Sequence, residues 1–508
     1  MPLSVSSQDI ESIISFEVSE FIVDGDNRIS SERTEAILSA FVGNHTDLEF
    51  LIEAGQALQN AHAYLGFNFH RVVLPPQTMD DGIVHLNVVV FALGNTQVNG
   101  NQHFSTENIL RSLSALSQGG PPNTREIARS LSLSNQQPSR QLIINLKDGE
   151  QPDTIDAEVL VKDQKPWMIF GNANNIGSHE TGRVRLTAGA QHSNVLGYDD
   201  KLSLSYTTSQ REPEDVKQYG INYNVPFYRW ASRVNLFYSK SDVDVGTVNA
   251  LDISGAGRFL GGSISHLLLR HGSYTHEINV GLVDKSFENS LLFGGADFAS
   301  DVRSRPVSLG YSAQYRIPQA EFGGSASFNI NTGGGRDNND GRYAANRFGA
   351  DSNWHRWNAS GYANYFLPQK WLLRGIVQGQ YAGESLIPGE QFGLGGVNSV
   401  RGFDERSVLG DSGVRLSGEL WTPPIDALRG LRILAFLDYG YMDRHDPLPG
   451  ETSGEGIAST GVGVRWNWEN YASVSVDYGY AINEATSLQG TTSDAGDSRW
   501  HVDLLLRY

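Results

Sequence analysis

A chain of 508 residues is long enough to form more than one domain, so the size of a hydrophobic core does not limit its fold. The formal net charge of −18 excludes the basic face on which nucleic-acid binding depends, and we therefore expect no nucleic-acid partner. Because the chain contains no cysteine, disulfides and thiolate metal sites are excluded as well.

The N-terminal residues and the apolar runs limit how the chain can meet a membrane. Residues 1–15 lack the basic and apolar regions of a signal peptide. We therefore expect a mature chain from which a signal peptide has been removed and to which a start Met has been added. The longest apolar runs, such as residues 431–437, are far shorter than the ~20 residues of a spanning helix, whereas a barrel strand needs only about 9–11 alternating residues.

Residues 16–163 contain one small α+β pattern twice, and we predict two domains, 16–92 and 93–163. Each copy has the order strand, helix, helix, strand, strand. The turn at residues 23–26, Val-Asp-Gly-Asp, returns as Val-Asn-Gly-Asn at residues 98–101, which indicates an internal repeat.

Two of the expected helices carry start signals. Thr46 and Glu49 have the spacing of a capping box, in which each side chain bonds a free backbone N–H of the first turn. Asn123 with Glu126 has the same spacing in the second copy. We expect a helix to begin at each of these sites.

Residues 164–508 contain no convincing helical stretch, and about sixteen segments alternate between apolar and polar residues. Leu416 and Leu420, for example, alternate with Ser417 and Glu419. Period two alone also fits a soluble sandwich, but long strands, aromatics near strand ends and a charged opposite face favour a membrane barrel. The fold class is therefore membrane all-β, a 16-stranded antiparallel transmembrane β-barrel preceded by two α+β domains. Long polar connections are expected at residues 333–347, 391–412 and 482–498.

A glycine-rich loop at residues 391–412 carries the sequence Val400-Arg401-Gly402-Phe403. A later strand, residues 431–441, contains Phe436-Leu437-Asp438. Alternation places Arg432, Leu434, Phe436 and Asp438 on one face of this strand, which is the lumenal face if the intervening apolar residues meet lipid.

The stretch LGGVNSVRGF at residues 394–403, followed by FLD at 436–438, resembles the signature of the outer-membrane barrel-assembly superfamily. The two N-terminal domains resemble POTRA (polypeptide-transport-associated) modules, and NQQPSRQ at residues 135–141 is similar to a stretch of the second such module in two-partner secretion transporters. With two modules and about sixteen strands, essentially the whole chain resembles this family, the TpsB exporters of filamentous haemagglutinins, haemolysins and contact-dependent inhibition toxins.

The resemblance implies a function and a set of site residues. An outer-membrane translocator of a Gram-negative bacterium would recognise a large secreted, TpsA-like exoprotein through periplasmic POTRA domains and export it through the barrel lumen. Arg401 would pair with Asp438 inside the barrel, and Gly402 would allow close backbone approach while Phe403 packs on the wall. Three further assignments follow the family: partner binding at Asn135, Pro138 and Arg140, a C-terminal barrel-assembly signal at Leu504, Leu506 and Tyr508, and residues 1–15 as a linker or the remnant of a plug helix.

The remaining expectations concern partners and alternatives. The secretion domain at the exoprotein's N-terminus, outer-membrane lipid and the barrel-assembly machinery are the implied partners, and the chain is expected to be a monomer. We expect neither enzymatic activity nor a cofactor or metal; residues 337–341 are interpreted as a solvated loop tip rather than a calcium loop, since the bidentate glutamate is missing. The alternatives are a barrel-insertion factor of the same superfamily and a passive porin, and the Arg401 loop is either a static clamp or a moving gate.

Overall fold

The computed structural model describes residues 16–508 apart from 79–80, 117–118, 180, 243–244, 249–250, 255, 289–291, 294–295, 298–300, 448, 451 and 488–489. The expected linker or plug remnant at residues 1–15 lies outside the described residues. The chain divides into two compact units, one of residues up to 136 with 140–163, the other of residues 137–139 with 164–508. Among the described helices, none combines the length and the apolar character needed to cross a membrane.

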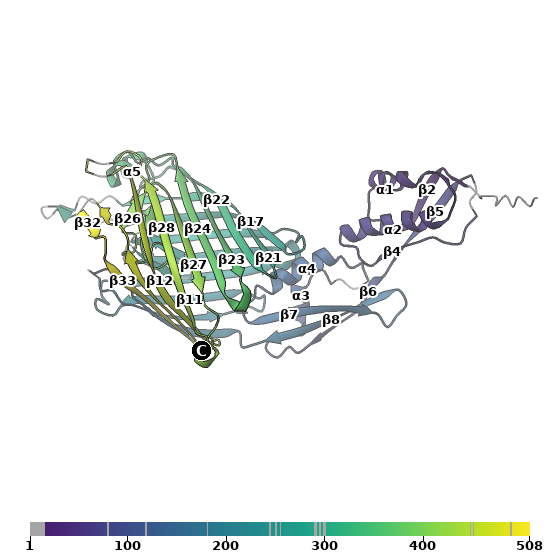
Figure 1. The fold of residues 1–508 in the computed structure, drawn as a ribbon, viewed down its shortest axis with the longest axis horizontal. Coiled ribbons are helices and arrows are strands. Elements are labelled where there is room, and N and C mark those ends of the chain that lie inside the picture. Colours follow the sequence, from purple (N-terminus) through teal and green to yellow (C-terminus); the bar gives the residue numbers. More distant parts are fainter. Residues whose placement is uncertain are drawn as a thin grey trace, which may run out of the picture. The chain divides into compact units, whose positions relative to one another are not determined.

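The first unit contains two modules of the same construction (Figure 1). Each has a three-stranded sheet whose central strand is the last of the three in the chain. The central strand runs parallel to one edge strand and antiparallel to the other. The first module comprises β1 (Phe16–Val18), β2 (Glu20–Gly25), α1 (Ser31–Leu38), η1 (Ser39–Phe41), β3 (Gly43–His45), α2 (Glu49–Tyr64), β4 (His70–Val73) and β5 (Ile83–Val90). The second comprises β6 (Ala92–Asn99), α3 (Thr106–Ser112), α4 (Thr124–Ser134), β7 (Arg140–Asp148) and β8 (Thr154–Asp163).

The internal repeat has a physical basis in two equivalent glycines. Gly25 is the last residue of β2 and Gly100 directly follows β6, and their φ angles are +87° and +91°. A Cβ at Gly25 would lie 2.4 Å from the carbonyl oxygen of Val88, and one at Gly100 would lie 2.5 Å from that of Val161. Both modules therefore need glycine at the same turn, because the chain passes directly over the central strand.

One of the two predicted helix starts is confirmed and the other is wrong. The Asn123 side chain accepts hydrogen bonds from the backbone N–H groups of Arg125 and Glu126, as a cap should. Thr46 does not cap α2, which begins at Glu49 with Leu48 at the N-cap position. The Asp47 side chain accepts from the Glu49 N–H at 3.0 Å instead, so the acid one residue later replaces the capping box.

The first module buries two histidines side by side. His62 and His70 stack with ring centroids 5.2 Å apart, and neither side chain is exposed. The His62 ring is bonded at both nitrogens, to the Leu58 carbonyl and the Arg28 N–H, whereas those of His70 have no hydrogen-bond partner among the described residues. Burial, and next the neighbouring His62, lower the pKa of His70 from 6.5 to about 4.

We predict that acidification destabilises this module. Below pH 6.5 the unfolded chain takes up a proton at His70 that the folded module resists, so stability present above pH 6.5 is lost as the pH falls towards 4, by up to about 3 kcal/mol. Hydrogen–deuterium exchange of α2 and β4, corrected for intrinsic rates and compared at pH 7 and pH 5, measures this loss. The His70→Leu variant is the control, and an equal pH dependence in both proteins would show that His70 is not the titrating group.

The second unit is a closed antiparallel barrel, whose tilted strands form the wall in Figure 1. β17 pairs with both β20 and β21, which form one strand interrupted at Arg305, so the described residues make sixteen barrel strands. The strands are β9 (Trp167–Asn174), β10 (Arg185–His192), β11 (Lys201–Ser209), β12 (Lys217–Phe227), β13 (Ser232–Ser241), β16 (Gly257–Leu267), β17 (Tyr274–Phe287), β20 (Val302–Ser304) with β21 (Pro306–Ile317), β22 (Ala320–Asn331), β23 (His355–Phe366), β24 (Leu372–Ala382), β27 (Ser412–Trp421), β28 (Arg432–Asp443), β29 (Gly454–Trp468), β30 (Ala472–Ala481) and β33 (Ser498–Arg507).

The two faces of the barrel wall differ as the alternation predicts. In β28, Leu434, Phe436 and Asp438 are buried, while Ile433 and Leu437 are exposed to the outside. An apolar outer surface over strands of eight to fifteen residues suits a bilayer. The predicted fold class is therefore confirmed.

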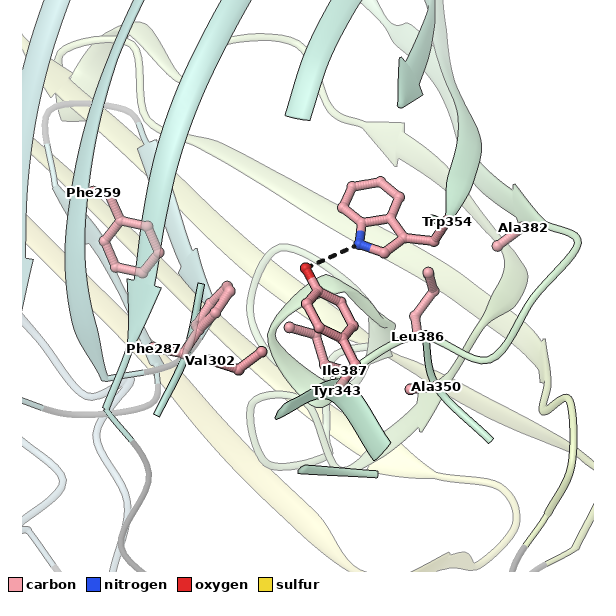
Figure 2. Packing of buried hydrophobic residues seen from close by; sticks show 9 residues of the cluster. All are labelled: Phe259, Phe287, Val302, Tyr343, Ala350, Trp354, Ala382, Leu386 and Ile387. Carbon is pink, nitrogen blue, oxygen red and sulfur yellow. Dashed lines mark hydrogen bonds between the residues drawn. The ribbon is translucent and has the colours of Figure 1, made fainter. Parts of the chain in front are cut away.

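The long connection between β22 and β23 departs from the sequence prediction. It contains α5 (Asp340–Asn346), which begins within the expected loop tip. Asp340 and Gly341 are exposed, as expected of a solvated tip, but Asn338 is buried and Asn339 caps the helix. Figure 2 shows Tyr343 of α5 beside Trp354, whose Nε1 donates to the Tyr343 hydroxyl at 3.4 Å. These two aromatics pack against inward-facing wall residues in a buried cluster of Phe259, Phe287, Val302, Tyr343, Ala350, Trp354, Ala382, Leu386 and Ile387. The connection thus packs on the inside of the barrel through a few apolar residues, although most of its sequence is polar.

Candidate functional site

The loop at residues 391–412 folds as a hairpin between β24 and β27, the eleventh and twelfth barrel strands. Its two short strands, β25 (Phe392–Leu394) and β26 (Val408–Gly410), pair antiparallel. The hairpin buries its apolar side chains against inward-facing wall residues; the cluster consists of Leu394, Val400, Phe403, Val408, Met442, Ile457, Ala481 and Ala485. The hairpin therefore lies inside the lumen.

The hairpin meets the wall backbone to backbone at Gly402. This residue has a φ of +94°, and a Cβ placed on Gly479 of β30 would lie 2.5 Å from the Gly402 nitrogen. Side chains at these two positions would push the hairpin off the wall. These two facing glycines thus allow the hairpin backbone to contact the backbone of β30 directly.

Arg401 binds Asp438 of β28 bidentately through one edge of its guanidinium group. Its Nε donates to Oδ2 at 2.8 Å and its Nη2 to Oδ1 at 2.9 Å, while its backbone N–H donates to Oδ2 at 3.2 Å. The guanidinium also lies over the Phe436 ring, with Cζ 3.5 Å from the centroid. Only 4% of the Arg401 side chain is exposed, and Asp438 is fully buried. A bidentate pair of this kind fixes orientation as well as position.

Further acids surround Arg401. Its Nη1 lies 2.8 Å from Glu419 Oε1 of β27 and 3.6 Å from Asp477 Oδ1 of β30. Asp477 also binds Arg465 of β29 at 2.8 Å. Three buried carboxylates thus face two arginines, so loss of Arg401 would leave a group of acids with only one cation, Arg465, beside them.

Ser417, Glu419 and Asp477 belong to the site but were not assigned to it from the sequence. The Ser417 hydroxyl donates to Asp438 Oδ1 at 2.6 Å. His501 of β33 accepts the Gly402 N–H on Nε2 at 3.0 Å. The available signal was the alternation itself, which put each of these polar residues on the lumenal side of its strand.

The predicted partner-binding residues have mostly internal contacts. The Asn135 side chain bonds both backbone groups of Leu142, accepting from its N–H at 2.7 Å and donating to its carbonyl at 3.0 Å. Arg140 is buried and donates from Nη2 to Ser134 Oγ at 2.9 Å. Pro138 belongs to the barrel unit by its contacts, and its carbonyl accepts from Gln164 at 3.4 Å. The structure therefore does not gather the three side chains into one exposed patch.

The C-terminal strand β33 closes the barrel against β9. Leu504 and Leu506 pair with Ala173 and Gly171, and Tyr508 exchanges two backbone hydrogen bonds with Ile169, at 2.9 and 3.0 Å. Leu506 and Tyr508 are exposed on the outer surface. The proposed assembly signal thus lies at the seam where the first and last strands meet.

Comparisons with known proteins agree with this architecture. Residues 154–466 match the family described as haemolysin secretion/activation protein ShlB/FhaC/HecB, and residues 16–90 match the POTRA domain of ShlB type. The chain is 26% identical over 478 residues to the outer membrane transporter CdiB of Dickeya dadantii, covering 91% of this chain and 82% of that protein. It is 21% identical over 430 residues to the heme/hemopexin transporter protein HuxB of Haemophilus influenzae, covering 82% of this chain and 74% of that protein.

A solved structure shares the fold. CdiB from Escherichia coli matches with a TM-score of 0.77 and 17% identity, over 100% of this chain and 93% of that one. The family match covers more than half of the chain and includes most of the barrel. The chain therefore belongs to the ShlB/FhaC/HecB family of haemolysin secretion/activation proteins and is an outer-membrane transporter of two-partner secretion.

Proposed function

We propose that the chain exports one large exoprotein, which binds the second POTRA module by adding a strand to the edge of its sheet and then passes the Arg401 hairpin in the lumen. The observation that carries this proposal is a closed barrel holding a seated hairpin, preceded by modules with edge strands. Such edges accept extended peptides, with main-chain bonds supplying affinity.

The two edge strands differ in how much backbone they offer. In the first module, the Val72 N–H of β4 is bonded by the Gln59 side chain at 3.2 Å; in the second, Asn135 occupies both backbone groups of Leu142. β4 has four residues and β7 has nine. Since backbone groups alternate between the two edges of a strand, the next groups of β7 that face the same way belong to Ile144 and Leu146. We therefore assign partner binding to the second half of β7.

Asn135 and Arg140 contribute to this recognition indirectly. Asn135 fills the start of the β7 edge, so an added strand pairs only beyond Leu142. Arg140 fixes the beginning of β7 against α3 and α4, since its guanidinium bonds the side chains of Asn108 and Ser134. The two residues thus set the register of the bound strand rather than contact its side chains.

The lumenal hairpin acts in this proposal as the resting obstruction. Its seat on Asp438 and on the Gly479 backbone holds it inside the barrel, where an extended chain has to pass. The clamp and gate interpretations then describe two positions of one hairpin. The barrel-assembly machinery inserts the barrel through the β33 seam, and the inserted chain acts as a monomer.

Secretion of a candidate partner tests the proposal. We expect a large exoprotein encoded beside this chain, co-expressed in a Gram-negative host, to appear in the medium only when this chain is present. The control is the same host with an unrelated outer-membrane barrel of similar abundance. A partner that stays in the periplasm while the purified chain conducts ions would contradict export and favour a porin.

A further inference from the structure

The hairpin has a second charged contact at its base, on a different part of the wall from Asp438. Glu390, at the end of η4 (Pro388–Glu390), directly precedes the hairpin, and its side chain is fully buried. Its Oε2 lies 2.8 Å from Lys285 Nζ of β17 and 2.9 Å from Arg356 Nη1 of β23. Two wall cations therefore share one carboxylate of the loop base.

The backbone of Glu390 is held by the same wall. Its carbonyl accepts from Arg356 Nη1 at 2.6 Å and from Gln380 Nε2 at 3.0 Å. A Cβ at the neighbouring Gly389 would lie 2.3 Å from the Phe287 ring, a member of the buried cluster in Figure 2. The loop base is thus pressed against the wall, and glycine is needed to bring it that close.

The two wall cations point into the lumen. Lys285 lies three residues beyond the outward-facing Leu282 on β17, and Arg356 directly precedes the outward-facing Trp357 on β23. Side chains alternate between the faces of a strand, so both cations belong to the inner face. Their contact with the buried Glu390 agrees with this placement.

The loop base and the loop tip contact different parts of the barrel wall. The Glu390 side chain contacts β17 and β23, the seventh and tenth of the sixteen described strands. Arg401 contacts Asp438 of β28, the thirteenth, and Gly402 lies against Gly479 of β30, the fifteenth, so the base and the tip are held by separate sets of strands. The two contacts also have opposite polarity, with an acid on the loop at Glu390 and a base on the loop at Arg401.

We propose that Glu390 is a positioning residue for transport, which ties the base of the hairpin to Lys285 and Arg356, so that the hairpin is held to the wall at its base as well as at its tip. This inference rests on the proposed function of the hairpin as the resting obstruction. Loss of the Arg401 contact weakens the hold on the tip alone. Loss of the Glu390 carboxylate weakens the hold on the base alone, where the buried Arg347–Asp411 pair remains. Full displacement of the hairpin requires both contacts to break.

Single-channel recording in planar bilayers tests this role without a partner protein. We expect Glu390→Gln and Arg401→Ala each to raise the fraction of time spent in a high-conductance state by roughly tenfold, since each removes one partner of a buried pair. The double variant should raise it by about the product of the two factors, because distant contacts act independently. Glu277→Gln is the matched control: it removes another lumenal carboxylate of β17, whose partner is Arg233 of β13 at 3.3 Å.

Three outcomes decide the inference. The inference is overturned if Glu390→Gln spends the same fraction of time in the high-conductance state as wild type and Glu277→Gln. It is also overturned if the double variant does not differ from Arg401→Ala in this fraction. The variant with exchanged charges, Glu390→Lys with Lys285→Glu, should spend less time in the high-conductance state than either single reversal. A purely structural role would not produce this rescue of the closed state. Heat-modifiable migration checks that each barrel is assembled, and the exchanged pair decides the question if Glu390→Gln does not assemble. Failure of the export assay with these conductance results intact would count against the proposed function alone.

Discussion

Replacing Arg401 by alanine is expected to lower export of the partner by roughly tenfold or more while the barrel remains assembled in the membrane. The substitution leaves Asp438, Glu419 and Asp477 facing one another with a single remaining arginine, Arg465. Breaking one side of a buried pair costs roughly 3–5 kcal/mol, because the other side stays buried and uncompensated. The partner in the medium, relative to the partner in the cells, measures the effect, and heat-modifiable migration reports the barrel.

Two further variants separate charge from geometry at this site. Arg401→Lys keeps the positive charge but loses the planar fork that reaches both oxygens of Asp438, so we expect export between wild type and Arg401→Ala. Arg233→Ala removes a lumenal arginine whose acid partner, Glu277, lies on the barrel wall. Wild-type export by Arg401→Ala, or an equal loss in Arg233→Ala, would contradict a specific role for the Arg401–Asp438 pair.

Removal of residues 16–163 is expected to abolish partner binding and export but to leave a conducting barrel. This segment contains both modules and both edge strands, whereas the barrel strands and the seam between β33 and β9 lie outside it. Retention of the purified N-terminal domain of the partner on the immobilised transporter measures the loss of binding. Export by the shortened barrel would show that POTRA recognition is not required.

A single-residue version of this experiment addresses the β7 edge. Leu146→Pro removes an N–H that faces the edge assigned to partner binding, whereas Leu146→Ala retains it. We expect the proline variant alone to lose binding, by roughly the contribution of one or two strand hydrogen bonds, about tenfold. Equal binding by the two variants would place the partner elsewhere on the module.

The sequence predicted the barrel and the position of Asp438 because strand alternation is a property of the backbone, and every long strand repeats it. Leu437 faces outward and Asp438 inward simply because they are consecutive residues of one strand. The Thr46 capping box failed because Asp47, one residue on, is an equally short acceptor, and the sequence does not rank the two. Local chemistry of this kind defines a helix start only to within a residue or two.

The contacts of the loop base were beyond sequence reasoning for a different reason. Lys285 and Glu390 are 105 residues apart, and Arg347 and Asp411, another buried pair at this end of the hairpin, are 64 apart. Neither pair lies in a motif or a regular spacing, so only the closure of the barrel brings their strands together. α5 was missed similarly, since its apolar underside consists chiefly of one residue, Tyr343, whose partners are supplied by distant strands.

The contacts of the hairpin tip also order events during assembly of the barrel. Asp438, Gly479 and His501 all lie C-terminal to the hairpin, and His501 belongs to the last strand. The tip therefore has no complete seat until the last strand, β33, has joined the barrel beside β9. A seated hairpin is consequently a marker of a finished barrel, and quality control that sensed its position would distinguish completed transporters from truncated ones.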